Sequence, residues 1–176
     1  AFIFISALYK TFQPLQDVWY NMLLLLAVAT MVIGNLFAIR QQNIKRFLAF
    51  SSIAQVGFIL LGIGSGSLDS AASSVIYFIL IYIFSNLAAF GVAAIISAAT
   101  GKENIDDYKG LYKTNPLLSW ILALALFSLA GIPPTAGFFG KLFLISSAAA
   151  KGSYAFIIAA ALNMIISLYY YLRVIR

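Results

Sequence analysis

The stretch LFSLAGIPPTAGFFGKLFL, residues 126–144, decides the fold that we predict for this chain. It lies within residues 114–150, where Lys141 is the only charged side chain. A straight helix over that range would be about 55 Å long, whereas the hydrocarbon core of a bilayer is roughly 30 Å thick. Even a tilt of about 40° leaves more than 40 Å along the membrane normal. The sequence therefore predicts a membrane-spanning helix that is interrupted along its length.

The interruption is predicted at GIPPTAG, residues 131–137. Pro133 and Pro134 lack a backbone N–H group, and their rings clash with the preceding helical turn. Gly131 and Gly137 flank the two prolines. Irregular backbone at membrane depth is tolerated only where it faces protein or water. We therefore expect residues 131–137 to be non-helical, buried against neighbouring helices and lining a cavity.

Lys141 is the candidate functional residue of this segment. It lies ten residues before Lys151, which is expected at the outer surface, and ten helical residues rise about 15 Å, half of the core thickness. A lysine near the midplane costs about 2.5 to 3.5 kcal/mol, which favours a proton relay over a structurally paired or snorkelling lysine. Burial disfavours its charged form, so it can exchange a proton near neutral pH, whereas an arginine would stay charged.

We expect the Lys141 ammonium to face the bundle interior. Hydrogen-bonding groups should come from the break, or from the helices that begin near Phe47 and Ser70, because an unpaired charge in lipid costs several kcal/mol.

The composition places the whole chain in a membrane. Hydrophobic residues make up 63% of it and charged residues 9%. Uncharged runs cover residues 18–39, 47–68, 70–101, 114–140 and 152–172, and each has about the 20 residues that span a bilayer. Alternation typical of strands is absent. Residues 1–176 are thus predicted as one all-α, polytopic membrane domain with about five full spans and a truncated N-terminal span over residues 1–9, in a fragment of a longer chain.

The positive charges indicate the topology of the predicted helices. If the connection between residues 40 and 46 faces the inside, most cations share that side, as the positive-inside rule requires. Residues 102–115 then form a polar inside loop. The cations of the inside are Arg40, Lys45, Arg46, Lys102, Lys109, Lys113, Arg173 and Arg176, and those of the outside are Lys10 and Lys151. This placement explains the net charge of +6 without nucleic-acid binding.

Several chemical roles lack the residues that they need. Cysteine and histidine are absent, which excludes thiolate-ligated iron–sulfur clusters, histidine-ligated haem, disulfides and ordinary zinc sites in this sequence. Neither a phosphate-binding glycine loop nor a nucleophile beside a base is recognisable. We therefore expect no cofactor, no metal and no self-contained active site in the chain.

Lys45 is a second candidate for proton transfer. Its position in the basic connection QQNIKR is explained by topology alone, and a role in proton uptake is the alternative. Ser52 and Gln55 follow on the same predicted helix, three residues apart and so close to one face. They either hold water between Lys45 and the helix interior or form ordinary hydrogen bonds between helices.

Three motifs resemble a known family. NIKRFLAFSSIAQVGF at residues 43–58, the stretch at 126–144, and SLYYYLRVIR at 167–176 are similar to the antiporter-like subunits of respiratory complex I, NADH:quinone oxidoreductase. The closing pattern favours the N subunit, called subunit 2 in mitochondria. The resemblance covers nearly the whole chain and corresponds to the second half of a fourteen-helix subunit. Subunits of sodium/proton antiporters share the broken helix and its lysine.

The resemblance implies a proton-translocating subunit of a redox-driven translocase in the bacterial or mitochondrial inner membrane. Lys141 then matches the lysine at the centre of a proton half-channel, and Lys45 matches a lysine that relatives often carry. Gln55 stands where relatives often have histidine. The partners would be other membrane-arm subunits, and NADH, FMN, iron–sulfur clusters and quinone would bind in partner subunits. The alternatives are a subunit of a multi-subunit cation/proton antiporter and a purely structural membrane subunit.

Overall fold

The computed structural model describes residues 2–64, 68–149, 152 and 154–176, and these are almost entirely helical. The elements are α1 (Phe2–Lys10), η1 (Gln13–Leu15), α2 (Gln16–Arg40), α3 (Ile44–Ile63), α4 (Leu68–Thr100), η2 (Ile105–Tyr108), α5 (Leu111–Thr114), α6 (Pro116–Ala130), α7 (Ala136–Ala149) and α8 (Tyr154–Ile175). The β-type pairing within these described residues is an isolated antiparallel bridge between Asn43 and Asn104. The predicted all-α class is confirmed.

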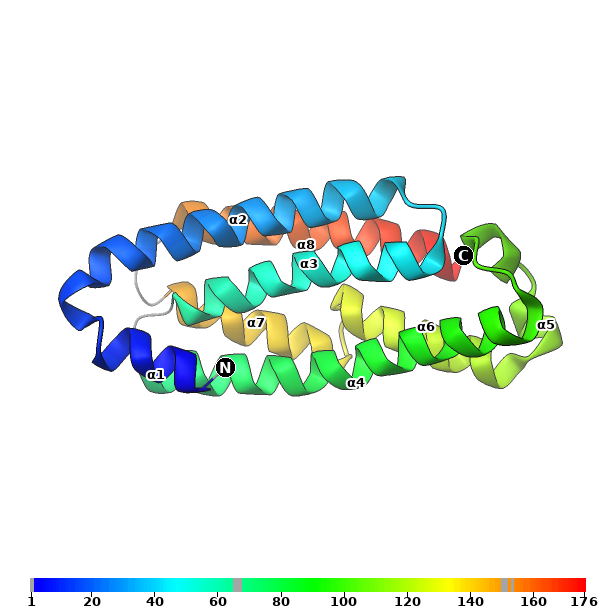
Figure 1. Ribbon diagram of the computed structural model, residues 1–176, viewed down its shortest axis with the longest axis horizontal. Coiled ribbons are helices and arrows are strands. Elements are labelled where there is room, and N and C mark those ends of the chain that lie inside the picture. The colour runs from blue at the N-terminus through cyan, green and yellow to red at the C-terminus, as the bar shows by residue number, and fades with distance from the viewer. Residues whose placement is uncertain (1, 65–67, 150–151, 153) are drawn as a thin grey trace.

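The number of predicted spans also agrees with the structure. Four helical segments of the described chain are long and apolar enough to cross a membrane, namely η1 with α2, then α3, α4 and α8. The apolar helices α6 and α7 are each too short, but they follow one another along the long axis of the bundle and make up the broken fifth span (Figure 1). The nine residues of α1 form the short N-terminal helix.

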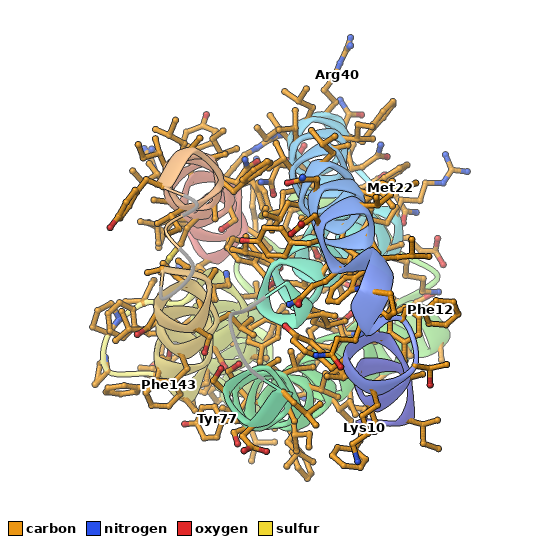
Figure 2. The ribbon with its side chains drawn as sticks, turned by 90° about the vertical axis from the view of Figure 1, so that its left-hand side faces the viewer. Lys10, Phe12, Met22, Arg40, Tyr77 and Phe143 are labelled. Atoms are coloured by element: carbon orange, nitrogen blue, oxygen red, sulfur yellow. The ribbon has the colours of Figure 1, made fainter. Side chains whose placement is uncertain are left out.

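Helix α3 lies at the centre of the bundle. Figure 2 shows the bundle end-on, with α3 surrounded by the other long helices. More than half of its most apolar segment, 56%, is buried, against 22–33% in the other three full spans. The connection between α2 and α3 has only three residues, so these two helices form an antiparallel hairpin. Helix α3 also packs against α4 and α7. The polar side chains of Ser51 and Gln55, in the middle of α3, are therefore held in the protein interior.

The two ends of the bundle differ in charge, as predicted. The α2–α3 connection, the segment with η2 and α5, and the end of α8 lie at one end, and the α1–α2 turn lies at the other (Figure 1). The eight cations assigned to the inside therefore share one end, called here the basic end. Lys10 is the last residue of α1, next to the α1–α2 turn at the opposite end (Figure 1), and Lys151 falls outside the described residues.

The polar loop predicted at residues 102–115 contains the short helices η2 and α5. Two backbone hydrogen bonds join it to the α2–α3 connection, from Ile44 N to Glu103 O at 2.8 Å and from Ile105 N to Gln42 O at 2.7 Å. The Asn43 side chain caps α3 by accepting from two backbone N–H groups of its first turn. These bonds hold α2, α3 and α4 together at the basic end.

Candidate functional site

The N–H groups within the helix break are hydrogen bonded by nearby backbone carbonyls. Residues 131–135 are non-helical, and the N–H groups of Gly131 and Ile132 donate to the carbonyl of Phe127 at 3.1 and 3.2 Å. The N–H of Thr135 donates to Ile132 O at 2.8 Å. Gly131 ends α6 with φ at +80°, in the left-handed region that glycine adopts without a Cβ penalty. The prolines have no N–H group, so every N–H group of residues 131–135 has an acceptor.

Two details of the predicted break are wrong. Gly137 is not in the break but in the first turn of α7, because nothing after Pro134 opposes the helical conformation. There it allows a close approach, since a Cβ on Gly137 would lie 1.8 Å from the carbonyl oxygen of Ser128. The break is also only partly buried: Gly131 is buried, but Pro133 and Pro134 are exposed on the surface of this chain. Their rings are apolar and carry no N–H, so this exposure is compatible with lipid or with another subunit.

The cavity beside the break is small. A void of about 10 Å³ lies between α3, α4, α6 and α7, close to the smallest volume that holds one water molecule. Ser85 of α4 donates a hydrogen bond of 2.8 Å to Ser128 of α6 at its edge. The wall consists of Gln55, Phe78, Ile81, Tyr82, Ser85, Ser128, Leu129 and Gly137.

Lys141 lies inside the bundle, as predicted. Its side chain is fully buried, and its ammonium donates to the carbonyl oxygens of Leu129 at 2.7 Å and of Ala130 at 3.2 Å. These carbonyls belong to the last turn of α6, where the break removes their helical partners. The negative end of the α6 dipole also favours a cation here. The Phe58 ring of α3, 5.0 Å from Nζ, adds a cation–π contact.

The partners of Lys141 are all neutral. In the described part of the chain, the ion pairs are Lys45 with Glu103 and Lys109 with Asp106, both at the basic end. A carbonyl, unlike a carboxylate, does not become an unpaired buried charge when the lysine loses its proton. The site is therefore compatible with both forms of the lysine, which is what a proton relay requires.

Gln55 donates to the carbonyl of Leu129, which also binds Lys141. It is 1% exposed on α3, and its Nε2 donates to Leu129 O at 3.0 Å and to the hydroxyl of Tyr171 at 3.3 Å. Leu129 O thus accepts from both Gln55 and Lys141. The other predicted residue of α3, Ser52, bonds within its own helix to Leu48 O at 2.9 Å.

Lys45 lies apart from Lys141, at the basic end of the bundle. Its Nζ donates to Glu103 at 2.6 Å and to Ser97 at 2.8 Å. Hydrogen bonds from Lys45, Asn43 and Ser97, together with the charge of Lys45, lower the pKa of Glu103 to about 2. The side chains of the pair are each 39% exposed, so this end of the site is open to solvent.

Glu103 and the acceptors of Lys141 were missed by the sequence analysis. Glu103 is the only glutamate of the chain and falls on the predicted side of Lys45, which is a weak signal for their pairing. The acceptors of Lys141 are backbone carbonyls, which no residue type marks. The break itself was the available signal, because every helix end leaves carbonyls unpaired.

Comparison with known proteins identifies the family of this bundle. The profile described as NADH:quinone oxidoreductase/Mrp antiporter, TM, matches residues 1–167. The chain belongs to this transmembrane antiporter-like family. A curated member, NADH-quinone oxidoreductase subunit N of Azobacteroides pseudotrichonymphae, is 51% identical over 99% of this chain and 36% of its own length. The predicted resemblance to the N subunit is thereby confirmed.

Two solved structures of the family share the fold. Respiratory complex I from Thermus thermophilus with bound aureothin matches with a TM-score of 0.74 and 33% identity, over 86% of this chain and 34% of that chain. The Mrp complex from Dietzia sp. DQ12-45-1b matches with a TM-score of 0.81 and 30% identity, over 90% and 30%. This chain spans about a third of the length of the curated relatives that it matches. As a member of this family with four long apolar helices, it is a multi-pass protein of the inner membrane.

Proposed function

We propose that this chain is part of a proton-translocating membrane-arm subunit of NADH:quinone oxidoreductase and that Lys141 is its proton relay. In this proposal, the oxidoreductase reaction and its cofactors belong to partner subunits, and their redox chemistry drives the translocation. The similarity to a subunit N at 51% identity supports the assignment to that complex.

The observation that carries the proposal is the burial of Lys141 at the end of a broken helix. Its ammonium is bound by two carbonyls at 2.7 and 3.2 Å and has only neutral partners. Such a group can lose its proton without leaving a buried counter-charge, and it regains the proton when a donor arrives. A buried lysine that served structure alone would be expected to pair with a carboxylate.

Lys45 is proposed as a relay at the inside entrance. It is half-exposed and close to solvent, and the α3 helix leads from it towards Gln55 and the Lys141 site. Ser52 and Gln55 are proposed to hold water on this route. The bond between Lys45 and Glu103 would have to open for each transfer, which makes this part of the proposal separately testable through Lys45→Ala.

The test compares Lys141→Ala with Lys141→Arg in the assembled complex. Both variants are expected to lower NADH-driven proton pumping at least tenfold, measured as acidification of inside-out membrane vesicles. Alanine removes the proton-carrying group, and arginine keeps the charge but does not release its proton. Lys113→Ala, which changes an exposed lysine of α5, is the matched control and should pump normally.

The arginine variant separates the proposed role from a structural one. A lysine needed only for its charge would be replaced by arginine, and Lys141→Arg would then pump at the rate of the unmodified complex. That result, or normal pumping by Lys141→Ala, would overturn the proposal.

A cation/proton antiporter subunit is the second candidate. It is supported by the 30% identity and the TM-score of 0.81 to the Mrp complex. In that case, a sodium gradient imposed across vesicles without NADH should drive proton movement that depends on Lys141. Absence of exchange in vesicles that pump with NADH excludes this candidate.

A further inference from the structure

Gln55 contains a polar atom that the site leaves unsatisfied. Its Nε2 donates to Leu129 O and to Tyr171, but its Oε1 is buried and has no hydrogen-bond partner in the structure. Buried polar atoms are normally paired. The same carbonyl of Leu129 also binds the Lys141 ammonium at 2.7 Å. The unpaired Oε1 of Gln55 is therefore held close to Lys141, the residue that is proposed to gain and lose a proton.

The charged and the neutral form of a lysine need different hydrogen-bond partners. An ammonium donates three hydrogen bonds and accepts none, whereas the neutral amine has a lone pair that accepts one. A glutamine amide has both two N–H donors and a carbonyl acceptor, and it exchanges them by turning about its last bond. The void of about 10 Å³ beside Gln55 and Tyr82 gives the amide room to turn.

We propose that Gln55 positions Lys141 in both of its forms, presenting Oε1 to the ammonium and an N–H group to the neutral amine. Gln55 neither gains nor loses a proton in this role. The inference rests on the proposed function of Lys141 and adds the residue that allows its proton to leave and return at little cost.

A chain of buried side chains holds Gln55 on its other side. The hydroxyl of Tyr171 accepts from Gln55 and is hydrogen bonded to that of Tyr170. Tyr170 in turn donates to Asn35 of α2 at 2.9 Å, and Asn35 donates to Asn163 of α8 at 2.8 Å. Hydroxyl groups both donate and accept. In the observed orientation Tyr171 accepts from Gln55, and its one hydroxyl proton serves the bond to Tyr170. With the amide turned, that proton would be donated to Oε1 instead, while Tyr170 would keep its bond to Asn35 and Leu129 O its bond from Lys141.

Among the described residues, few ionisable groups surround Gln55 and Lys141. Tyr171 and Tyr170 of α8 and Tyr82 of α4 are the titratable groups beside it. From α3 and α6 the site receives Phe58 and the carbonyls of Leu129 and Ala130, which are neutral. Near neutral pH, the pH dependence of proton transfer should therefore follow Lys141 and respond to a charge placed at position 55.

The test uses three substitutions of Gln55 in the assembled complex. Gln55→Leu keeps the size but removes donor and acceptor, and should lower pumping about tenfold. Gln55→His restores one donor and one acceptor in its neutral form and should keep most of the pumping. Gln55→Glu places a carboxylate beside the ammonium, which favours the charged form, and should move the alkaline limit of pumping up by about one pH unit.

The matched control is Ser74→Ala, which removes a buried hydroxyl whose hydrogen bonds stay within α4. It should leave both the rate and the pH profile of pumping unchanged. A merely structural role for Gln55 predicts loss of assembled complex in Gln55→Leu, with an unshifted pH profile in Gln55→Glu.

The outcomes separate this inference from the proposed function. Normal pumping by Gln55→Leu, or an unshifted profile in Gln55→Glu, overturns the role of Gln55 even if Lys141→Ala abolishes pumping. Normal pumping by Lys141→Ala overturns both. If the Gln55→Leu complex does not assemble, Gln55→His and Gln55→Glu provide the test. The inference is refuted if the pH profile of pumping in both variants is identical to that of the unmodified complex.

Discussion

Gly137→Ala tests whether the close contact between α6 and α7 positions Lys141. The added Cβ would lie 1.8 Å from Ser128 O and 2.7 Å from Ser128 C, and both are backbone atoms of a neighbouring helix. A side-chain rotation cannot relieve this clash. The two half-helices must move apart by more than about 1 Å to reach ordinary van der Waals separation. Lys141 lies one turn farther along α7 and moves with it.

The magnitude follows from these contacts. Overpacking of a tight interior costs about 1 to 3 kcal/mol. Lengthening the 2.7 Å bond from Lys141 to Leu129 weakens a hydrogen bond to a charged group, worth about 1.5 to 3 kcal/mol. We expect a destabilisation of at least about 3 kcal/mol, seen as a lower thermal unfolding midpoint of the purified complex. Proton pumping should fall with it.

The matched control is Gly91→Ala on α4, because an added Cβ there meets no heavy atom within 4 Å. Alanine has a higher helix propensity than glycine, by about 1 kcal/mol, so this variant should be as stable as the unmodified protein or more so. If Gly137→Ala and Gly91→Ala behaved alike in both unfolding and pumping, the reasoning from the α6–α7 contact would be refuted.

Three further predictions concern the surroundings of the site. The stabilisation from Glu103 should be complete above pH 4.5 and lost as the pH falls from there towards its pKa of about 2; hydrogen exchange at the Ile105 amide should therefore be equally protected at pH 5 and 7. Asn35→Leu should destabilise the complex by about 1 to 3 kcal/mol in thermal unfolding, because buried partners lose their bonds, and adding Asn163→Leu should recover part of the loss. Gly131→Ala should cost about 1 to 2 kcal/mol in the same assay, because alanine is strained at a φ of +80°, and an unchanged midpoint would contradict that reason.

The sequence was sufficient for every feature that depends on local composition. Apolar runs of about 20 residues specify spans because lipid excludes unpaired backbone groups. Pro133 and Pro134 specify the break, since a proline ring opposes helix wherever it occurs in the chain. The inward orientation of Lys141 was also predictable, because lipid offers no partner for a charge. The extent and the burial of the break were overestimated: Gly137 allows a close approach without departing from helix, and Pro133 and Pro134 are exposed on this chain.

The tertiary structure alone decided which residues meet. Gln55 and Lys141 share a carbonyl of Leu129, and Glu103 bonds Lys45 from a loop almost sixty residues away. These pairings depend on how each helix is rotated about its axis and on which neighbours it packs against. Membrane helices are apolar on every face, so the periodicity that marks the inner face of a soluble helix is missing. For the same reason, the acceptors of Lys141, which are backbone atoms freed by the break, became visible only once the two half-helices were placed end to end.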